Sequence, residues 1–580
     1  MRGSAIMDDS PLTVDYLGCA GRATLPRAGA PVDYTSVPFT AFPARSVPES
    51  PNYLRQWTRA GTHPTVRPAH PSDRAHLALG GTLTGVLDAA LAERITATLR
   101  SGWYADLAEL PGDLVGCLVT DDRVFLFRSL FTRDTLFYKQ SGHTLAWSSD
   151  PADLVPDTLD RLDRETIWRI CRGDSIFAYP ELGLLRPGHL LVFDGVSAEV
   201  VQYDRITPKP LPRGSTARDY AERAWELLLA ATRPYAHGGH IGLLLSGGMD
   251  SSAVAAALVA NGADVTAYHL ATDDPLADES EYAREVCRHL SIPFVPIMTD
   301  TGAGHVNEDW RFSHPYNHTG FRWLEQIVQR VHQDGVELLT WGRDGDLLFS
   351  PAPDYGVCDV LRGRLSLPEK RLMLRGLLCS RWTLTDLLKS VRRSYSLAID
   401  ASAFGDYTRH PDFLVSMPGV RFELPNPEFV PEEQTTDLAL AWPHGVQFCS
   451  PMADRAMYEL MTGMPRAYRC ISYGGRNINK PVLRLMLEDR LPPMIWRRHG
   501  RLWLGSPHEN FCLNHPQTLA GLLGPDSLLA RLNIVDPAQV VAVLGHPLST
   551  RRHAQSLICT AMTELFLRSL ESRAAHPVRS

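Results

Sequence analysis

The sequence of 580 residues lacks several features that mark whole classes of protein. Its ten cysteines are scattered without a CxxC pair, which argues against a disulfide framework and against a zinc knuckle. No run approaches the ~20 apolar residues that a membrane-spanning helix requires, and the opening stretch MRGSAIMDDSPLTVDY lacks the apolar core of a secretory signal. The net charge of −7 provides no basic field for a nucleic-acid backbone. We therefore expect a cytoplasmic protein that binds neither membrane nor nucleic acid.

The chain is too long for one hydrophobic core, and its patterning changes along its length. Short apolar runs separated by turn signals such as QSGH and RPGH predict an antiparallel, β-rich domain over residues 1–207. A proline-rich stretch, Pro208–Ser215, interrupts this pattern. Strand-like runs then alternate with helix-like runs, which predicts a doubly wound parallel sheet in a second domain over 216–580, with a helical insertion at about 355–443.

The stretch LLLSGGMDSS, Leu243–Ser252, joins an apolar strand to a helix-like run. Such a loop lies at the carboxyl edge of a parallel sheet, where α/β proteins bind ligands. Its glycines allow backbone N–H groups to approach an anion, and its serines add hydroxyl donors at the positive end of a helix dipole. The Walker motif GxxxxGKS/T is absent. We therefore predict a phosphate cradle of another type, in which the carboxylate of Asp250 binds a Mg²⁺ ion that bridges the phosphates.

This loop resembles the pyrophosphatase loop of the N-type ATP pyrophosphatases, in particular the asparagine synthetase branch. Further stretches similar to motifs of that branch are DESEYAREVCRHLSIPF (278–294), WGRDGDLLF (341–349), SPMADRAMYEL (450–460) and NKPVLRLMLEDRLPPMIWRR (479–498). The resemblance implies ATP as the nucleotide and Asp346 as the second Mg²⁺-binding aspartate. It also implies that the nucleotide is held by Leu245, Ser246, Gly247, Gly248, Met249, Asp250, Ser251, Ser252, Leu270 and Gly342.

The N-terminal part is similar to the glutaminase-like domain of the same branch, over Gly112–Val155 and over LGLLRPGHLLVFDG (182–195). A working glutaminase of this kind resembles an N-terminal-nucleophile enzyme that begins with cysteine and holds glutamine with RGPD and NGE motifs. Here Arg2 follows Met1, both motifs are absent, and Cys19 is interpreted as a structural cysteine. We therefore predict a degenerate glutaminase-like domain, and we expect the attacking amine to belong to the substrate itself.

Two branches of the family use such an amine, the β-lactam synthetases and the lasso peptide cyclases. In the first, a glutamate before the PFLD motif helps to deprotonate the amine, and Gln447 stands at that place here. A neutral amide cannot act as a base, whereas a peptide α-amine with a pKa of about 7.7–8.0 needs no strong base. These arguments favour the cyclase.

The predicted lasso peptide cyclase adenylates an Asp or Glu side chain of a precursor core peptide and joins it to the N-terminal amine, with a leader peptidase as a further partner. Three alternatives stay open. They are β-lactam synthetase-like ring closure, a glutamine-independent asparagine synthetase-like ligase, and an inactive scaffold that binds a peptide.

A cation is also expected at the reacting centre. The family usually places a lysine after the LPxxVxWR motif, where it stabilises the charge that develops as the acyl-adenylate reacts. Here WRRHGRLWLG puts His499 at or near that position, flanked by Arg498 and Arg501, and an arginine can supply a fixed positive charge. Lys480 in the NKPVLR stretch is a lesser candidate.

Two other stretches contain chemically active residue types. The insertion at 355–443 is rich in arginine and lysine, which we interpret as a solvated basic face, with enclosure of a peptide as the alternative. HENFCLNH (508–515) has side chains that bind metals, but it matches no known metal-ligand spacing, so no metal is assigned to it.

Overall fold

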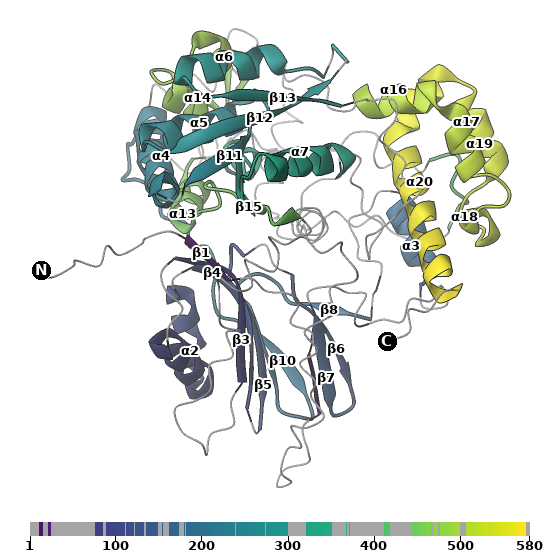
Figure 1. The fold of residues 1–580 in the computed structure, drawn as a ribbon, viewed down its shortest axis with the longest axis horizontal. Helices are drawn as coiled ribbons and strands as arrows, with labels where there is room; N and C mark the ends of the chain where they lie inside the picture. The colour runs from purple at the N-terminus through teal and green to yellow at the C-terminus, as the bar shows by residue number, and fades with distance from the viewer. Residues whose placement is uncertain are drawn as a thin grey trace, which may run out of the picture.

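The computed structural model of the chain describes residues 11–14, 21–24, 76–84, 89–299, 321–350, 411–417 and 444–575, with short gaps inside the longer ranges and isolated positions near 370. In Figure 1 the N-terminal sheets lie below a parallel sheet with its helices, and a group of C-terminal helices lies to one side. The predicted mixed α/β fold is thus confirmed. Within the described part of the chain, no helix is long and apolar enough to cross a membrane.

The N-terminal part contains two sheets whose neighbouring strands all run antiparallel. The six-stranded sheet has the order β1 (Pro11–Val14), β3 (His76–Thr84), β4 (Gly112–Val119), β5 (Val124–Arg128), β9 (His189–Phe193) and β10 (Ala198–Gln202). The four-stranded sheet has the order β2 (Gly21–Thr24), β7 (Thr144–Ser148), β6 (Phe137–Ser141) and β8 (Gly183–Leu184). The predicted antiparallel, β-rich part is confirmed, and its glutaminase-like character stays a prediction.

Both faces of the six-stranded sheet are covered, because successive residues of a strand point to opposite sides. Cys117 and Leu126 belong to a core cluster that includes Leu145 of the four-stranded sheet. Leu118 and Phe125 belong to the cluster beneath helix α2 (Ala89–Ser101). Burial of both faces explains why β5 reads as the continuous apolar run VFLF in the sequence.

After the N-terminal part, the chain forms a five-stranded sheet that is parallel throughout, with the strand order β13-β12-β11-β14-β15. Its strands are β11 (His240–Leu244), β12 (Asp264–Thr272), β13 (Phe294–Thr299), β14 (Leu338–Trp341) and β15 (Gln447–Cys449). From β11 the chain adds strands first on one side and then on the other, so the strand order reverses between β11 and β14. A crevice at the carboxyl ends of the strands forms at such a switch point.

Helices cover both faces of this sheet, as the alternation of strand-like and helix-like runs predicts. On one face, the strands share a core cluster with α4 (Ala217–Thr232), α5 (Met249–Ala260), α6 (Ser280–Leu290), α13 (Arg455–Gly463) and α14 (Pro481–Leu487). The other face packs against α7 (Phe321–Gln333). Along β11, Ile241 and Leu243 enter the first cluster, while Leu244 packs against the second. The sheet is thus buried on both sides.

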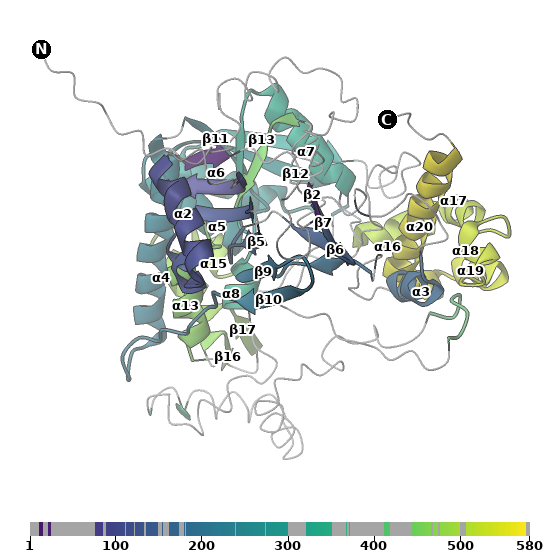
Figure 2. The same ribbon diagram turned by 90° about the horizontal axis from the view of Figure 1, so that it is seen from below.

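The C-terminal helices form a core cluster of their own, built from α16 (Ser506–Asn514), α17 (Pro516–Leu522), α18 (Leu528–Arg531), α19 (Pro537–Leu544) and α20 (Pro547–Ala575). Helix α3 (Arg164–Arg172), which precedes all of them by more than 300 residues in the sequence, packs in the same cluster beside α20, as Figures 1 and 2 show. Hydrogen bonds that hold α3 there run from Trp168 Nε1 to the carbonyl of Val415 at 2.7 Å, from Thr560 Oγ1 to the carbonyl of Cys171 at 3.3 Å, and from the Arg164 guanidinium to the carbonyl of Asn533 at 2.5 Å.

The linker after β10 is fixed to helix α13. Arg455 forms an ion pair with Asp204, and Lys209 Nζ lies 2.6 Å from a carboxylate oxygen of Glu459. Gly463 ends α13 against the backbone of Pro210. The domain boundaries at 207 and 216 stay predictions, and most of the predicted insertion at 355–443 lies outside the described residues.

Replacing Gly463 by alanine is expected to destabilise the protein, because the new Cβ would lie 2.5 Å from the backbone nitrogen of Pro210. The matched control is Gly521→Ala in α17, where a Cβ meets nothing within 4 Å. That control is expected to stabilise the chain by about 0.5–1 kcal/mol through helix propensity. Thermal unfolding of both variants measures the two signs, and an unchanged melting temperature for Gly463→Ala would contradict the packing described here.

Candidate active site

The loop that follows β11 lies at the carboxyl edge of the parallel sheet, as predicted. Leu245 is fully buried, and its N–H donates to the carbonyl of Tyr268 on β12 at 2.9 Å. Helix α5 begins at Met249, with Gly248 as its N-cap residue. Gly247 has a φ of +84°, in the left-handed region that favours glycine, and a Cβ there would lie 2.9 Å from the carbonyl oxygen of Glu279. The loop therefore presents backbone N–H groups at the N-terminus of a helix, where anions bind.

The three serines of the loop hold its shape. Ser246 Oγ lies 3.0 Å from Ser251 Oγ and accepts from the N–H of Gly248 at 3.2 Å. Ser252 Oγ donates to the carbonyl of Gly248 at 2.7 Å. Ser251 and Ser252 are buried, and the described contacts of their hydroxyls lie within the loop. These contacts fix the shape of the loop, and its hydroxyl and N–H donors to an anion stay a prediction.

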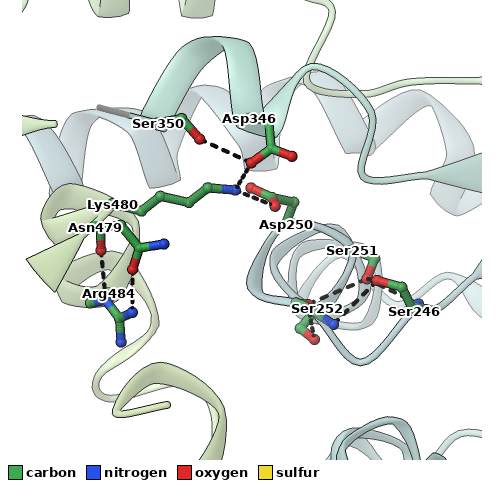
Figure 3. A network of polar contacts seen from close by, with 10 residues as sticks. Ser246, Asp250, Ser251, Ser252, Asp346, Ser350, Asn479, Lys480 and Arg484 are labelled. Carbon is green, nitrogen blue, oxygen red and sulfur yellow. Dashed lines mark hydrogen bonds and ion pairs between the residues drawn. The ribbon is translucent and has the colours of Figure 1, made fainter. Parts of the chain in front are cut away.

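Asp250 and Asp346 lie close together on either side of one lysine ammonium group, as Figure 3 shows. Lys480 Nζ is 2.5 Å from Asp250 Oδ2 and 2.7 Å from Asp346 Oδ1. The side chain of Lys480 is only 4% exposed, whereas that of Asp346 is 52% exposed. The ammonium group thus lies beneath the two carboxylates, and the carboxylate of Asp346 reaches solvent.

Close approach of two segments brings these groups together. Asp346 belongs to the short helix α8 (Gly345–Phe349), which follows β14. A Cβ on Gly342 would lie 2.3 Å from the nitrogen of Ser251, and a Cβ on Gly345 would lie 2.2 Å from Asp250 Oδ1. Only glycine allows the loop between β14 and α8 to contact the first turn of α5 at this distance.

Two non-glycine residues with positive φ flank the same point. Asp344 precedes α8 with a φ of 69°, and Lys480 precedes α14 with a φ of 51°. Left-handed backbone is uncommon for residues with a side chain and costs of the order of 1–2 kcal/mol. Such conformations cluster at functional sites, where the surrounding structure enforces them.

Three residues that the sequence did not single out position the charged groups. Ser350 Oγ donates to Asp346 Oδ1 at 2.9 Å, one helical turn after it. Arg484 binds the carbonyl and the side-chain oxygen of Asn479, each at 2.7 Å, and so fixes the turn that carries Lys480. Burial lowers the pKa of Arg484. For Ser350 the available signal was its spacing of four residues from Asp346, which places both on one face of a helix.

The remaining predicted residues differ in where the structure places them. Gly342 contacts the α5 turn, and Leu270 lies in the carboxyl half of β12, where it pairs with Ile297 of β13. Arg498 does not join the two aspartates; it forms an ion pair with Glu279. His499 and Arg501 lie outside the described residues. The structure therefore brings Lys480, the lesser candidate, to the carboxylates.

The two carboxylates fit a divalent cation. Carboxylate oxygens are ligands that Mg²⁺ prefers, and such sites are completed by phosphate oxygens and water. Among the described residues, no group of three or more His, Cys, Asp or Glu side chains is placed to hold a metal ion. Asp250 and Asp346 would therefore hold Mg²⁺ together with ligands that these two residues do not supply, such as nucleotide phosphates.

An aromatic and cationic group lies at the end of β14. The rings of Trp341 and Phe448 are 4.9 Å apart, and the guanidinium of Arg343 lies 5.2 Å from the Trp341 ring centroid. Ser450 Oγ donates to the carbonyl of Arg343 at 3.0 Å, which ties the end of β15 to this loop. Gln447 begins β15, opposite Leu338 at the start of β14, so it lies at the other end of the strand.

His269 supports the loop from below. Its ring is buried, and Nδ1 lies 2.7 Å from the carbonyl oxygen of Leu245, so Nδ1 carries the proton and donates. Burial lowers the pKa of His269 below its usual value of 6.5, against smaller opposing effects from the Leu245 hydrogen bond and the carboxylate of Asp278. The imidazole is thus held neutral where the strand enters the loop.

Comparison with known proteins identifies one family and several solved structures of low similarity. The family model described as asparagine synthase matches residues 226–406 and 434–568, more than half of the chain. A search of curated proteins found no match.

Three of the solved structures that match this chain are compared with it in identity, coverage and TM-score. An NH3-dependent NAD synthetase from Campylobacter jejuni is 14% identical over 35% of this chain and 100% of that one, with a TM-score of 0.20. A glutamine phosphoribosylpyrophosphate amidotransferase from B. subtilis is 11% identical over 50% of this chain and 76% of that one, with a TM-score of 0.19. A U34-tRNA thiolase from Methanococcus maripaludis is 13% identical over 33% of this chain and 72% of that one, with a TM-score of 0.18. At these TM-scores the likeness carries no argument.

The lowered pKa of His269 predicts a pH dependence of stability. Because the folded-state pKa lies below the unfolded value of 6.5, neutral His269 contributes stability above about pH 6.5, and this contribution is lost as the pH falls. His269→Asn retains a donor near the Nδ1 position and does not titrate. Between pH 7.5 and 5.5 the melting temperature of the wild type is expected to fall more steeply than that of the variant. Parallel curves would contradict this assignment.

Proposed function

We propose that this chain, which belongs to the asparagine synthase family, is an ATP-dependent lasso peptide cyclase that forms AMP and closes a macrolactam ring in a precursor peptide. Family membership supports an ATP-dependent amide-forming ligase. The observation that carries the proposal is the convergence of Asp250, Asp346 and Lys480 beside the glycine-serine loop, at the point where the strand order reverses.

In this proposal the loop from Ser246 to Ser252 binds the phosphates of ATP. The backbone N–H groups at the start of α5 face the anion, and the helix dipole adds favourable electrostatics. Internal hydrogen bonds between Ser246, Gly248, Ser251 and Ser252 hold the loop in one shape before ATP arrives. Binding therefore requires little reorganisation of the backbone.

Asp250 and Asp346 would hold Mg²⁺, which supplies charge neutralisation of the phosphates when it is bound. Lys480 adds a fixed positive charge at the same place. Its ammonium group is oriented by both carboxylates, and its backbone N–H donates to the carbonyl of Arg469 at 3.0 Å. A preorganised cation of this kind stabilises negative charge that develops during reaction.

The first chemical step forms an acyl-adenylate. A carboxylate oxygen of an Asp or Glu side chain in the peptide attacks the α-phosphorus in line, and the bond from that phosphorus to the bridging oxygen of the β-phosphate breaks. The electron pair leaves with pyrophosphate. In this proposal Lys480 contributes positive charge beside the leaving group, since its ammonium group contacts both carboxylates.

The second step forms the amide. The neutral N-terminal amine attacks the activated carbonyl, the bond from carbon to the AMP oxygen breaks, and the nitrogen loses one proton to water. A peptide α-amine has a pKa of about 7.7–8.0, so a useful fraction is neutral near pH 7.5 without a dedicated base. The enzyme must hold the two ends of the peptide close together, because water otherwise competes for the adenylate.

The peptide substrate is supported by the sequence. The RGPD and NGE motifs that hold glutamine are absent, and Gln447 stands where a β-lactam synthetase has a glutamate. An inactive scaffold would have no use for two carboxylates and a buried lysine brought together by close glycine contacts. A precursor core peptide and a leader peptidase are therefore the proposed partners.

Lys480→Met is expected to lower AMP formation by about 10²–10³-fold, the usual effect of removing one preorganised charge from a reacting centre. The matched control is Lys209→Met, whose lysine is 69% exposed and pairs with Glu459 in the linker. Each protein is incubated with ATP, Mg²⁺ and a linear candidate precursor peptide that has a free N-terminal amine and an Asp or Glu side chain. Chromatography measures AMP, and mass spectrometry measures the loss of one water from the peptide.

Each outcome of this experiment decides between the proposed activities. Peptide dehydration with AMP release, absent in Asp250→Ala and Asp346→Ala, supports the cyclase. AMP release only with small β-amino acids supports β-lactam synthetase-like ring closure instead. Equal AMP formation by wild type and Lys480→Met contradicts the role of Lys480, and a wild type that forms no AMP under any condition contradicts the proposed activity.

A further inference from the structure

The side chain of Arg498 is mostly buried, unlike that of a cation in a loop that faces solvent. It follows the short helix α15 (Pro493–Trp496) and forms an ion pair with Glu279, in which the two side chains are only 10% and 15% exposed. The guanidinium carbon of Arg498 also lies 4.0 Å from the ring centroid of Tyr282. Its positive charge is thus engaged by one carboxylate and one aromatic ring.

Both partners of Arg498 belong to the segment that supports the phosphate loop. Glu279 is the N-cap residue of α6, and its carbonyl accepts from the N–H of Ala283 at 3.1 Å. A Cβ on Gly247 would lie 2.9 Å from that carbonyl oxygen and 3.1 Å from both the Ala283 nitrogen and Tyr282 Cβ. The first turn of α6 therefore forms the surface against which Gly247 is packed.

A second contact shows that this turn is held from another side. Asp278 Oδ1 accepts from the hydroxyl and the N–H of Ser280, at 2.5 and 3.2 Å, and lies 4.0 Å from His269 Nε2. His269 in turn donates to the carbonyl of Leu245. One end of the loop is thus fixed through His269, and the contact at Gly247 depends on Glu279 and Tyr282.

We infer that Arg498 is a positioning residue for the nucleotide, acting through Glu279 and Tyr282 on Gly247 of the phosphate loop. This inference rests on the proposed function, because it assigns to the loop the binding of ATP phosphates. Without the guanidinium, the Glu279 carboxylate is left buried beside Tyr282 with no cation, and the first turn of α6 shifts to solvate it. Gly247 then loses the surface that fixes its left-handed backbone, and the N–H groups of the loop lose their alignment.

The test compares Arg498→Ala with Arg497→Ala. Arg497 is the adjacent residue and is exposed, and its guanidinium carbon lies 4.5 Å from the ring centroid of Trp496. Calorimetry measures the Kd of a non-hydrolysable analogue, α,β-methylene-ATP, in the presence of Mg²⁺. Arg498→Ala is expected to weaken binding by tenfold or more, whereas Arg497→Ala leaves it within twofold of the wild type.

Conservative variants separate positioning from general loss of structure. Arg498→Lys keeps a cation beside Glu279 and is expected to recover part of the affinity, while Glu279→Gln is expected to reproduce much of the loss. In steady-state assays, the KM for ATP rises more than kcat falls, because the residue acts on binding geometry. If Arg498→Ala does not fold, as judged by thermal unfolding, Arg498→Lys and Glu279→Gln provide the comparison.

The outcomes distinguish this inference from the proposed function. A wild type that does not bind the analogue would overturn both. Normal binding by the wild type with equal Kd values for Arg498→Ala and Arg497→Ala would overturn the inference alone. A loss of kcat at unchanged KM and Kd would also overturn it, because that pattern places Arg498 at the reacting atoms and not behind the loop.

Discussion

The contact of one buried ammonium group with two carboxylates is the interaction on which the site depends. Asp250 and Asp346 come from segments almost 100 residues apart in the sequence. Their carboxylates lie close together in a partly buried place, where two like charges repel each other strongly. Lys480, from a third segment, offsets this repulsion because its ammonium group attracts both carboxylates. The turn before α14, the loop after β14 and the first turn of α5 are therefore fixed relative to one another by electrostatics as well as by packing.

The backbone around this contact is built to allow it. Gly342 and Gly345 let two main chains approach to distances that a Cβ would forbid, and Asp344 and Lys480 adopt left-handed backbone. The free energy that such conformations cost is offset by the helices and strands on either side, since α5, α14 and the parallel sheet share one core cluster. A rigid core thus supports a small region of unfavourable local geometry.

Much of the fold and part of the site follow from the sequence. Alternating runs predict the antiparallel and parallel sheets, because strand periodicity reports burial directly. The loop from Ser246 to Ser252 is readable because parallel strands bring their carboxyl ends to one edge, whereas Asp346 was predicted from the resemblance to the asparagine synthetase branch. For the cation, the sequence favoured Arg498, His499 and Arg501 by position. Arg498 pairs with Glu279, whereas His499 and Arg501 lie outside the described residues and stay predictions.

The direction of a side chain depends on contacts distant in the sequence. Arg498 turns toward Glu279, 219 residues away, and Lys480 turns toward Asp250, 230 residues away. The serines illustrate the same limit, since their residue type indicates hydroxyl donors, but only the structure shows that two of them point inward. Likewise, nothing in the periodicity of α3 indicates that its apolar face belongs with the last helices of the chain.

The placement of α3 has a consequence for how the chain can be divided. Although α3 lies in the first third of the sequence, it contributes Ile167, Trp168 and Cys171 to the C-terminal core cluster. A fragment that begins after α3 would therefore leave the last helices with an open apolar face.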